Sequence, residues 1–317
     1  MSFLILIIGF ALLIKGADIF VEGASSIAKR FNVPPMLIGL TIVAMGTSAP
    51  EAAVSISSSL AGQNDMSIAN VVGSNFFNIL IVLGISAIIA KLPVEKDTIK
   101  KDTPFLIFIS ALLLILSLNL ELTRLDGLVF LVLFVLFLIN MIKSNINSKN
   151  NEDSSSETAI AIEASDTKAV SLPKTIVVCI VGIVGIVFGG DLVVDSATNI
   201  ATSFGMSANL VGLTIVAMGT SLPELVTSVI AVRKGETEIA IGNVIGSNIF
   251  NILLVLGLAA VIHPMTISTM ALIDTVFMTA ITILLYLFMK KNNSLNKNQG
   301  IIFIVIYFAY MIYTIVR

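Results

Sequence analysis

Two glutamates lie midway along strongly apolar stretches, Glu51 in GTSAPE and Glu224 in GTSLPE. A carboxylate in the interior of a membrane is costly unless it is paired, hydrated or bound to a cation. The surrounding stretches, 39–59 and 212–232, contain no Lys or Arg that could pair with these side chains. The pattern therefore favours a bound cation as the partner of both glutamates.

Each glutamate directly follows a proline, Pro50 or Pro223. A proline inside a helix lacks the N–H that would bond the carbonyl one turn earlier. Non-helical backbone at membrane depth is tolerated where it lines a cavity, which leaves carbonyls such as those of Thr47 and Thr220 free to bind an ion. Carboxylate, carbonyl and hydroxyl oxygens without Cys or His are the ligands that Ca²⁺ and Na⁺ prefer.

A second set of polar residues repeats at a spacing of four, which places each group on one helix face. The two groups are Asn70, Ser74, Asn78 and Asn243, Ser247, Asn251. Small and polar residues in membrane helices also serve as ordinary interhelical hydrogen-bond partners. We favour that role for Asn70 and Asn243, which lie nearer the helix ends, and an ion-site role for the serines and for Asn78 and Asn251.

Three further polar residues are assigned to other roles. Asp18 and Asp191 occupy matching places near basic helix ends, where structural or gating roles are expected. The single histidine, His263, precedes Pro264 at the end of an apolar stretch and is expected to be interfacial.

The polar motifs belong to a duplication with an offset of 173 residues. The stretches 39–59 and 212–232 are identical at 13 of 21 positions, and 68–89 and 241–262 at 15 of 22. An ungapped match of this length indicates an internal repeat. A duplicated membrane protein without transport activity would explain the repeat, but not why its most similar stretches contain the polar residues.

Composition excludes a soluble domain, because 56% of the residues are hydrophobic and only 12% are charged. The one cysteine, Cys179, allows no disulfide. About 20 apolar residues cross a bilayer as a helix, and ten segments meet this requirement. They are 2–26, 34–60, 67–90, 104–120, 125–142, 174–198, 207–232, 240–262, 268–289 and 299–316.

We therefore predict an all-α integral membrane protein of ten transmembrane helices. It consists of a first five-helix repeat (1–142), a polar linker (143–173) and a second five-helix repeat (174–317). The linker is rich in Asn, Ser and Glu and is expected to be solvated and disordered. Because five spans are an odd number, the second repeat enters the membrane upside down, as in secondary transporters with inverted repeats.

Basic residues predict the orientation of the chain. The loops after the first, third, fifth, seventh and ninth spans hold 15 Lys and Arg residues, whereas the opposite side holds only Arg124 and Arg317. Cytoplasmic loops carry the excess of basic residues. Both termini are therefore expected outside and the linker in the cytoplasm, in a plasma (inner) membrane.

The paired motifs GTSAPE and GTSLPE, together with GSNFFN and GSNIFN, resemble the cation/calcium antiporter superfamily, specifically its prokaryotic-type sodium/calcium exchangers. The resemblance covers the whole chain except the linker. It implies a calcium site made by the carboxylates of Glu51 and Glu224 and the carbonyls of Thr47 and Thr220. It further implies flanking sodium sites and a central amide pair, which would use Ser48, Ser74, Ser221, Ser247, the Thr47 and Thr220 hydroxyls, the carbonyls of Ala44 and Ala217, Asn78 and Asn251.

One position departs from some members of the superfamily. Potassium-dependent relatives carry aspartates around the place of Asn251, and some archaeal relatives carry one at that place. With Asn in both halves the fixed charge of the site is expected to be −2, so the family's exchange of three Na⁺ for one Ca²⁺ would be electrogenic. The proton-coupled branch usually has a glutamate where this chain has Gly73 and Gly246.

The function expected from the sequence is Na⁺/Ca²⁺ antiport by alternating access, with calcium extrusion as the usual direction. A Ca²⁺/H⁺ antiporter and an uncoupled cation channel remain as alternatives. An intramembrane hydrolase is disfavoured because Ser48 and Ser74 have no nearby His or Lys. We expect no enzymatic activity, no cofactor and no nucleic acid, with Ca²⁺, Na⁺ and the lipid bilayer as partners of a monomeric chain.

Overall fold

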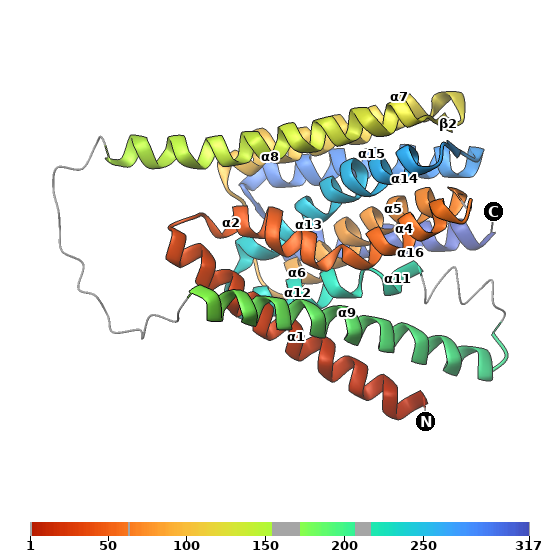
Figure 1. The fold of residues 1–317 in the computed structure, drawn as a ribbon, viewed down its shortest axis with the longest axis horizontal. Coiled ribbons are helices and arrows are strands. Elements are labelled where there is room, and N and C mark those ends of the chain that lie inside the picture. Colours follow the sequence, from red (N-terminus) through yellow and green to blue (C-terminus); the bar gives the residue numbers. More distant parts are fainter. Residues whose placement is uncertain (1, 63, 154–171, 207–216, 317) are drawn as a thin grey trace.

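The computed structural model describes residues 2–62, 64–153, 172–206 and 217–316. The chain is mostly helical, and its helices run roughly along one common direction (Figure 1). Both chain termini lie at one end of this long axis, and the end of α8 and the start of α9 lie at the other (Figure 1).

The first half begins with the long helix α1, continues through helices interrupted by π-helical turns, and ends with the long helix α8. Its elements are α1 (Ser2–Phe31), α2 (Pro35–Ile38), η1 (Gly39–Val43), α3 (Ala44–Thr47), α4 (Ala49–Leu60), α5 (Asn64–Phe77), η2 (Asn78–Val82), α6 (Leu83–Ile89), β1 (Leu92–Pro93), η3 (Thr98–Asp102), α7 (Thr103–Leu116), η4 (Ser117–Asn119), β2 (Glu121–Leu122) and α8 (Arg124–Asp153).

The described part of the second half follows the same order. Its elements are α9 (Leu172–Ser203), α11 (Ala217–Gly219), α12 (Leu222–Arg233), α13 (Thr237–Phe250), η6 (Asn251–Leu256), α14 (Gly257–Ile262), β3 (Met265–Thr266), α15 (Thr269–Asn292), β4 (Ser294–Leu295) and α16 (Lys297–Val316).

Many of these helices are long and apolar enough to cross a membrane. Eight qualify as unbroken spans within the described ranges, and the bent pair Pro35–Thr47 and Ala49–Leu60 would form a ninth. The predicted segment 207–232 lies partly outside the described residues, and its described part contains α11 and α12. The chain is therefore a multi-pass membrane protein.

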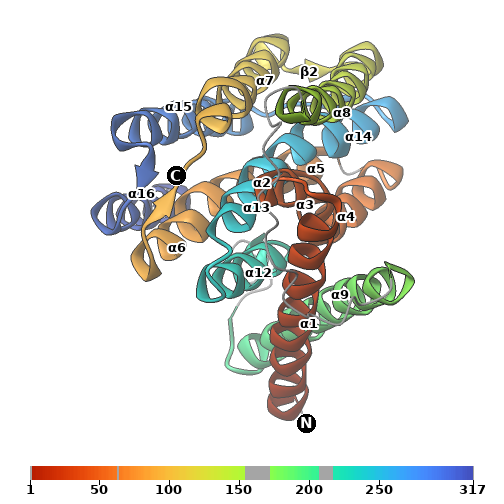
Figure 2. The same ribbon diagram turned by 90° about the vertical axis from the view of Figure 1, so that its left-hand side faces the viewer.

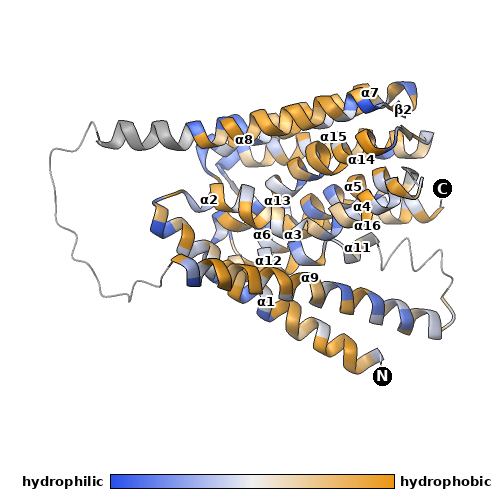
Figure 3. Cartoon of the chain, in the orientation of Figure 1, coloured by the Kyte–Doolittle hydropathy of each residue, from blue (hydrophilic) through white to orange (hydrophobic). Residues whose placement is uncertain are grey.

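Two of the spans form the interior of the bundle. The apolar windows of 66–89 and 237–262 are 78% buried, whereas no other unbroken span exceeds 39%. The remaining spans are less buried and expose many large apolar side chains, among them Phe3 on α1 and Leu125 on α8. Hydrophobic residues predominate along the apolar spans of both helices (Figure 3). The two interior spans are those that carry the predicted polar stripes.

Helices α1 and α9 pack side by side along one edge of the bundle (Figures 1 and 2). Their backbones approach so closely that a Cβ added to Gly16 would lie 2.7 Å from the backbone nitrogen of Ile186. Only glycine fits such a contact, which is common where membrane helices meet through small residues.

Two features of the loops were not predicted. Residues 143–153, expected to begin a disordered linker, instead continue α8 as a helix, although its apolar span ends at Lys143. Two short antiparallel pairings also join the halves, with Leu92 opposite Leu295 and Leu122 opposite Met265.

Candidate cation-binding site

Both glutamates lie in the first turn of a helix that begins just after a break. Helix α3 ends at Thr47, and Ser48 adopts φ −83° and ψ 10°. The helical segment Pro35–Thr47 and the following helix α4 meet at a bend of 48°, and Glu51 lies in the first turn of α4. Helix α12 begins in the same way after Ser221, at φ −93° and ψ 5°. Proline suits the first turn because its missing N–H would have no helical partner there. The free N–H groups and the dipole of a helix start also stabilise a carboxylate.

Each glutamate is fully buried and accepts hydrogen bonds from serines of both halves. The Oε1 atom of Glu51 accepts from Ser221 Oγ at 2.9 Å and from Ser74 Oγ at 3.5 Å. The Oε1 atom of Glu224 accepts from its matching serines, Ser48 Oγ at 2.8 Å and Ser247 Oγ at 3.4 Å. The serine next to one helix break thus orients the carboxylate at the other break, and the two carboxylates belong to one cluster.

Four buried asparagines connect the two interior spans. Asn78 Nδ2 donates to Asn248 Oδ1 at 3.2 Å, and Asn251 Nδ2 donates to Asn75 Oδ1 at 3.1 Å. Asn75 and Asn248 were not among the predicted site residues. The sequence did contain a signal for them, because they match across the repeat within GSN and lie three residues before Asn78 and Asn251. They orient the amides of the predicted pair.

The oxygen atoms that remain free are the most informative feature of this cluster. Within the described part of the chain, Glu51 Oε2, Glu224 Oε2, Asn78 Oδ1 and Asn251 Oδ1 are buried and accept no hydrogen bond. Buried polar atoms are normally satisfied. A symmetric set of four orphaned acceptors, two of them on carboxylates, fits a cation as the missing partner.

The composition of the cluster narrows the kind of cation. No three His, Cys, Asp or Glu side chains gather as a metal centre among the described residues. The available ligands are therefore two carboxylates supplemented by neutral oxygens, which suits hard cations such as Ca²⁺ and Na⁺ rather than soft transition metals.

The two threonines are held by asparagines of the opposite half. Thr47 Oγ1 donates to Asn243 Oδ1 at 3.0 Å, and Thr220 Oγ1 donates to Asn70 Oδ1 at 3.4 Å. Each donated proton leaves the lone pairs of the hydroxyl oxygen available to an ion.

The same asparagines support the start of each glutamate helix. Asn70 Nδ2 contacts Glu51 O at 3.3 Å, and Asn243 Nδ2 contacts Glu224 O at 3.5 Å. Asn70 and Asn243 therefore make the interhelical hydrogen bonds that were favoured for them from the sequence. The Ala44 and Ala217 backbone, whose carbonyls complete the predicted ligand set, begins α3 and α11.

The interior spans change their winding at the amides. Asn78 begins the π-helical turn η2, and Asn251 begins η6. Such turns are rare and frequently occur at functional sites. The sequence did not reveal them, since no proline or glycine marks these positions.

The polar residues assigned other roles lie outside the cluster. His263 follows the end of α14, and its ring nitrogen lies 2.9 Å from the carbonyl of Pro264. Asp18 forms ion pairs with Lys15 and Lys234.

A bundle of apolar spans around a buried, duplicated set of carboxylate, hydroxyl and amide oxygens defines the class of membrane cation transporters. The family model described as "Sodium/calcium exchanger protein" matches residues 1–143 and 174–316. The chain belongs to this family of cation/calcium antiporters and is a transporter rather than an enzyme.

Several named or solved proteins are similar over nearly their whole length. The putative antiporter CaxA of Alkalimonas amylolytica is 40% identical over 308 residues, covering 96% of this chain and 95% of that protein. The sodium/calcium exchanger MaX1 of Methanosarcina acetivorans is 33% identical over 342 residues, covering 98% and 97%. A solved structure of the sodium-calcium exchanger NCX_Mj superposes with a TM-score of 0.85 at 31% identity, covering 99% of this chain and 98% of that one.

Proposed function

We propose that this protein exchanges Na⁺ for Ca²⁺ across the membrane by alternating access. The proposed architecture is ten spans in two five-helix repeats of opposite orientation, 1–142 and 174–317, joined by the segment 143–173. The 173-residue offset of the matched motifs and the odd number of predicted spans per repeat support it.

The observation that carries the proposal is the set of four orphaned acceptor oxygens on Glu51, Glu224, Asn78 and Asn251. In the proposed site Ca²⁺ binds between the two carboxylates, with the carbonyls of Thr47 and Thr220 as further ligands. Na⁺ binds at flanking positions that share these oxygens, so that the two ions compete. The flanking ligands are Ser48, Ser74, Ser221, Ser247, the threonine hydroxyls and the carbonyls of Ala44 and Ala217.

Charge explains why the ions are exchanged rather than leaked. Two carboxylates give the site a fixed charge of −2, which one Ca²⁺ neutralises. Without a cation, closing the site would bury two uncompensated charges in a low dielectric, which is strongly unfavourable. Only the occupied protein then converts readily between its two open states. Exchange of three Na⁺ for one Ca²⁺ would move net charge and respond to voltage.

The distribution of basic residues supports an orientation with both termini outside and the segment between the halves in the cytoplasm. With sodium higher outside the plasma membrane, this arrangement drives calcium out of the cell. A single chain contains both halves of the site, so a monomer suffices for transport.

Flux into proteoliposomes tests this function. Vesicles loaded with sodium and diluted into sodium-free buffer should accumulate radiolabelled calcium, and the reversal potential should follow both gradients at a three-to-one ratio. Calcium uptake driven by a pH jump without sodium would indicate proton coupling instead. Calcium flux that follows its own gradient alone would indicate a channel.

A further inference from the structure

The amide of Asn251 has one oxygen and one NH₂ group, and only the oxygen can bind a cation. The side chain is fully buried, and its Oδ1 atom has no hydrogen-bond partner among the described residues. Its Nδ2 atom donates to Asn75 Oδ1 at 3.1 Å. The group that Asn75 presents to Asn251 therefore decides which end of the Asn251 amide is left for the ion.

Asn75, on α5, is also buried and is held by two groups that can only accept. Its Nδ2 atom donates to the backbone carbonyl of Asn248 at 3.4 Å and to the thioether sulfur of Met278, on α15, at 3.6 Å. Neither a carbonyl oxygen nor a thioether sulfur can donate a hydrogen bond. These two acceptors fix the nitrogen of the Asn75 amide on their side, so that its oxygen faces Asn251.

The contacts form a chain that runs in one direction. Because Asn75 presents an oxygen, Asn251 presents N–H to it and keeps its own oxygen free. The reversed Asn251 amide would place two oxygens against each other and leave its N–H groups buried without an acceptor. Unpaired buried polar groups are costly, so the orientation of Asn251 follows from the acceptors that hold Asn75.

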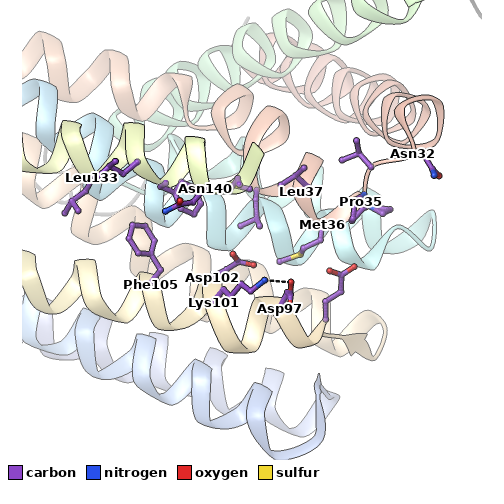
Figure 4. A pocket seen from close by; sticks show the side chains of 17 residues that line it. Asn32, Pro35, Met36, Leu37, Asp97, Lys101, Asp102, Phe105, Leu133 and Asn140 are labelled. Carbon is purple, nitrogen blue, oxygen red and sulfur yellow. Dashed lines mark hydrogen bonds and ion pairs between the residues drawn. The ribbon is translucent and has the colours of Figure 1, made fainter. Parts of the chain in front are cut away.

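The matching contacts of the other half lack this anchor. Asn78 Nδ2 donates to Asn248 Oδ1 at 3.2 Å, but Asn248 Nδ2 is buried without a partner in the described ranges. The residue that matches Met278 at the offset of 173 is Phe105, which has no oxygen, nitrogen or sulfur acceptor in its side chain. Phe105 instead lines a cavity that contains none of the proposed ion ligands (Figure 4). Of the two amides, only that of Asn251 has an anchored partner.

We propose that Asn75, anchored by Met278, is a positioning residue that holds the Asn251 amide with its oxygen toward the cation. This inference rests on the proposed binding of Ca²⁺ and Na⁺ between the halves. The two glutamates supply the charge of the site, and Asn75 makes a neutral amide present an acceptor only. A carboxylate in place of the amide would need no such partner, because both of its oxygens are acceptors.

Equilibrium binding of radiolabelled Ca²⁺ to the purified full-length protein tests this role independently of transport. Asn75→Leu is similar in size but has no acceptor, so it should weaken Ca²⁺ binding at least about tenfold. In an Asn251→Asp background either oxygen can face the ion, and there Asn75→Leu should weaken binding by less than about threefold. The same loss in both backgrounds would indicate a purely structural role of Asn75 and would overturn the proposal.

A substitution on α15 tests the anchor. Met278→Leu removes the sulfur acceptor but leaves the Asn248 carbonyl, so Ca²⁺ binding should weaken by about two- to threefold. Met289→Leu is the matched control, because Met289 is also buried in α15 and accepts a hydrogen bond from Thr103 Oγ1 at 3.8 Å. The control should bind Ca²⁺ as the wild type does. Equal binding by the two variants would show that Met278 does not anchor Asn75.

The outcomes separate this inference from the proposed function. Asn75→Ala also lacks the acceptor and gives the same readout should Asn75→Leu fail to fold. Wild-type protein that binds no Ca²⁺ would contradict the proposed function and this inference with it. Wild-type binding that remains unchanged in Asn75→Leu or Asn75→Ala would overturn this inference alone.

Discussion

The two halves of the chain repeat the residues of the proposed ion site but differ in the ion pairs that connect their first helices to the opposite half. In the first half, Asp18 on α1 forms an ion pair with Lys234 at 2.7 Å, and Glu22 lies 3.7 Å from the same ammonium. Lys234 directly follows α12, a helix of the second half. A second contact lies nearby, where Ser25 Oγ and Lys29 Nζ reach Glu236 at 2.5 and 3.6 Å.

The second half has the matching acidic residues, but the first half has no basic residue at the matching place to pair with them. Asp191 and Asp195 on α9 match Asp18 and Glu22 at the offset of 173 residues, but the residue that matches Lys234 is Ala61. Neither acid forms an ion pair with a basic side chain in the part of the chain that the structure describes. The ion pairs between α1 and the opposite half therefore have no counterpart on α9.

Topology gives a physical reason for this difference. In the proposed inverted arrangement the loop after α4 and the loop after α12 face opposite sides of the membrane. A lysine at both places would put basic charge outside as well as inside, against the usual bias of short loops. An inverted repeat can thus duplicate the residues of the proposed ion site. The ion pairs that depend on a lysine in a short loop are expected on the cytoplasmic side only.

Substitution of the glutamates should have the largest effect, and the effect should be the same in both halves. Glu51→Gln and Glu224→Gln each remove one of the two charges that balance Ca²⁺, so sodium-driven calcium uptake should fall at least about 100-fold, equivalent to about 2.7 kcal/mol or more. The measurement is initial uptake of radiolabelled calcium by proteoliposomes, with Glu121→Gln as the control. Near-normal transport by either variant would remove that glutamate from the site.

The serines that orient these carboxylates should produce the next largest effect. Ser48→Ala and Ser221→Ala each delete a hydrogen bond to the glutamate of the other half, at 2.8 and 2.9 Å. A hydrogen bond to a charged group contributes about 1.5–3 kcal/mol, so the apparent affinity for calcium should fall by about 10- to 100-fold in each variant.

The control for the serines is Ser110→Ala, because Ser110 is equally buried but donates only to the carbonyl of Leu106 in its own helix. Calcium dependence of the uptake rate distinguishes the variants. Unequal losses for Ser48→Ala and Ser221→Ala would show that the halves are not equivalent at the site.

The smallest effect should come from breaking the ion pairs between α1 and Lys234. Here the matching substitutions in the two halves should have different effects. Asp18→Asn removes the ion pairs with Lys15 and Lys234, whereas Asp191→Asn removes none that the structure describes. Partly exposed ion pairs contribute about 0.2–1 kcal/mol each, so amide exchange in the turn 233–236 should increase by about two- to fivefold in Asp18→Asn alone. Combining Asp18→Lys with Lys234→Asp should restore the wild-type exchange. Equal rates of amide exchange in Asp18→Asn and Asp191→Asn would show that the ion pairs of Asp18 do not stabilise this turn.

The sequence was sufficient for much of the fold because a bilayer makes spans readable as long apolar segments. It also placed the helix breaks correctly, since Pro50 and Pro223 mark them. The glutamates were recognisable because an unpaired charge in an apolar stretch has few explanations.

Other features depend on contacts between distant segments and were not predictable from one sequence. Asn75 and Asn248 match across the repeat, but their hydrogen bonds to Asn251 and Asn78 follow only from the packing of the two interior spans. The π-helical turns arise where these packed helices meet, without a local sequence signal. The continuation of α8 through Asp153 was missed because the polar composition of 143–153 was interpreted as a disordered linker.

Anomalous diffraction from crystals grown with calcium tests the central claim most directly. A cation between the halves predicts one strong calcium peak in contact with both Glu51 Oε2 and Glu224 Oε2, at about 2.3–2.6 Å, that fades as sodium is raised. Calcium bound elsewhere with no density between these oxygens, or a peak that is indifferent to sodium, would contradict the shared site.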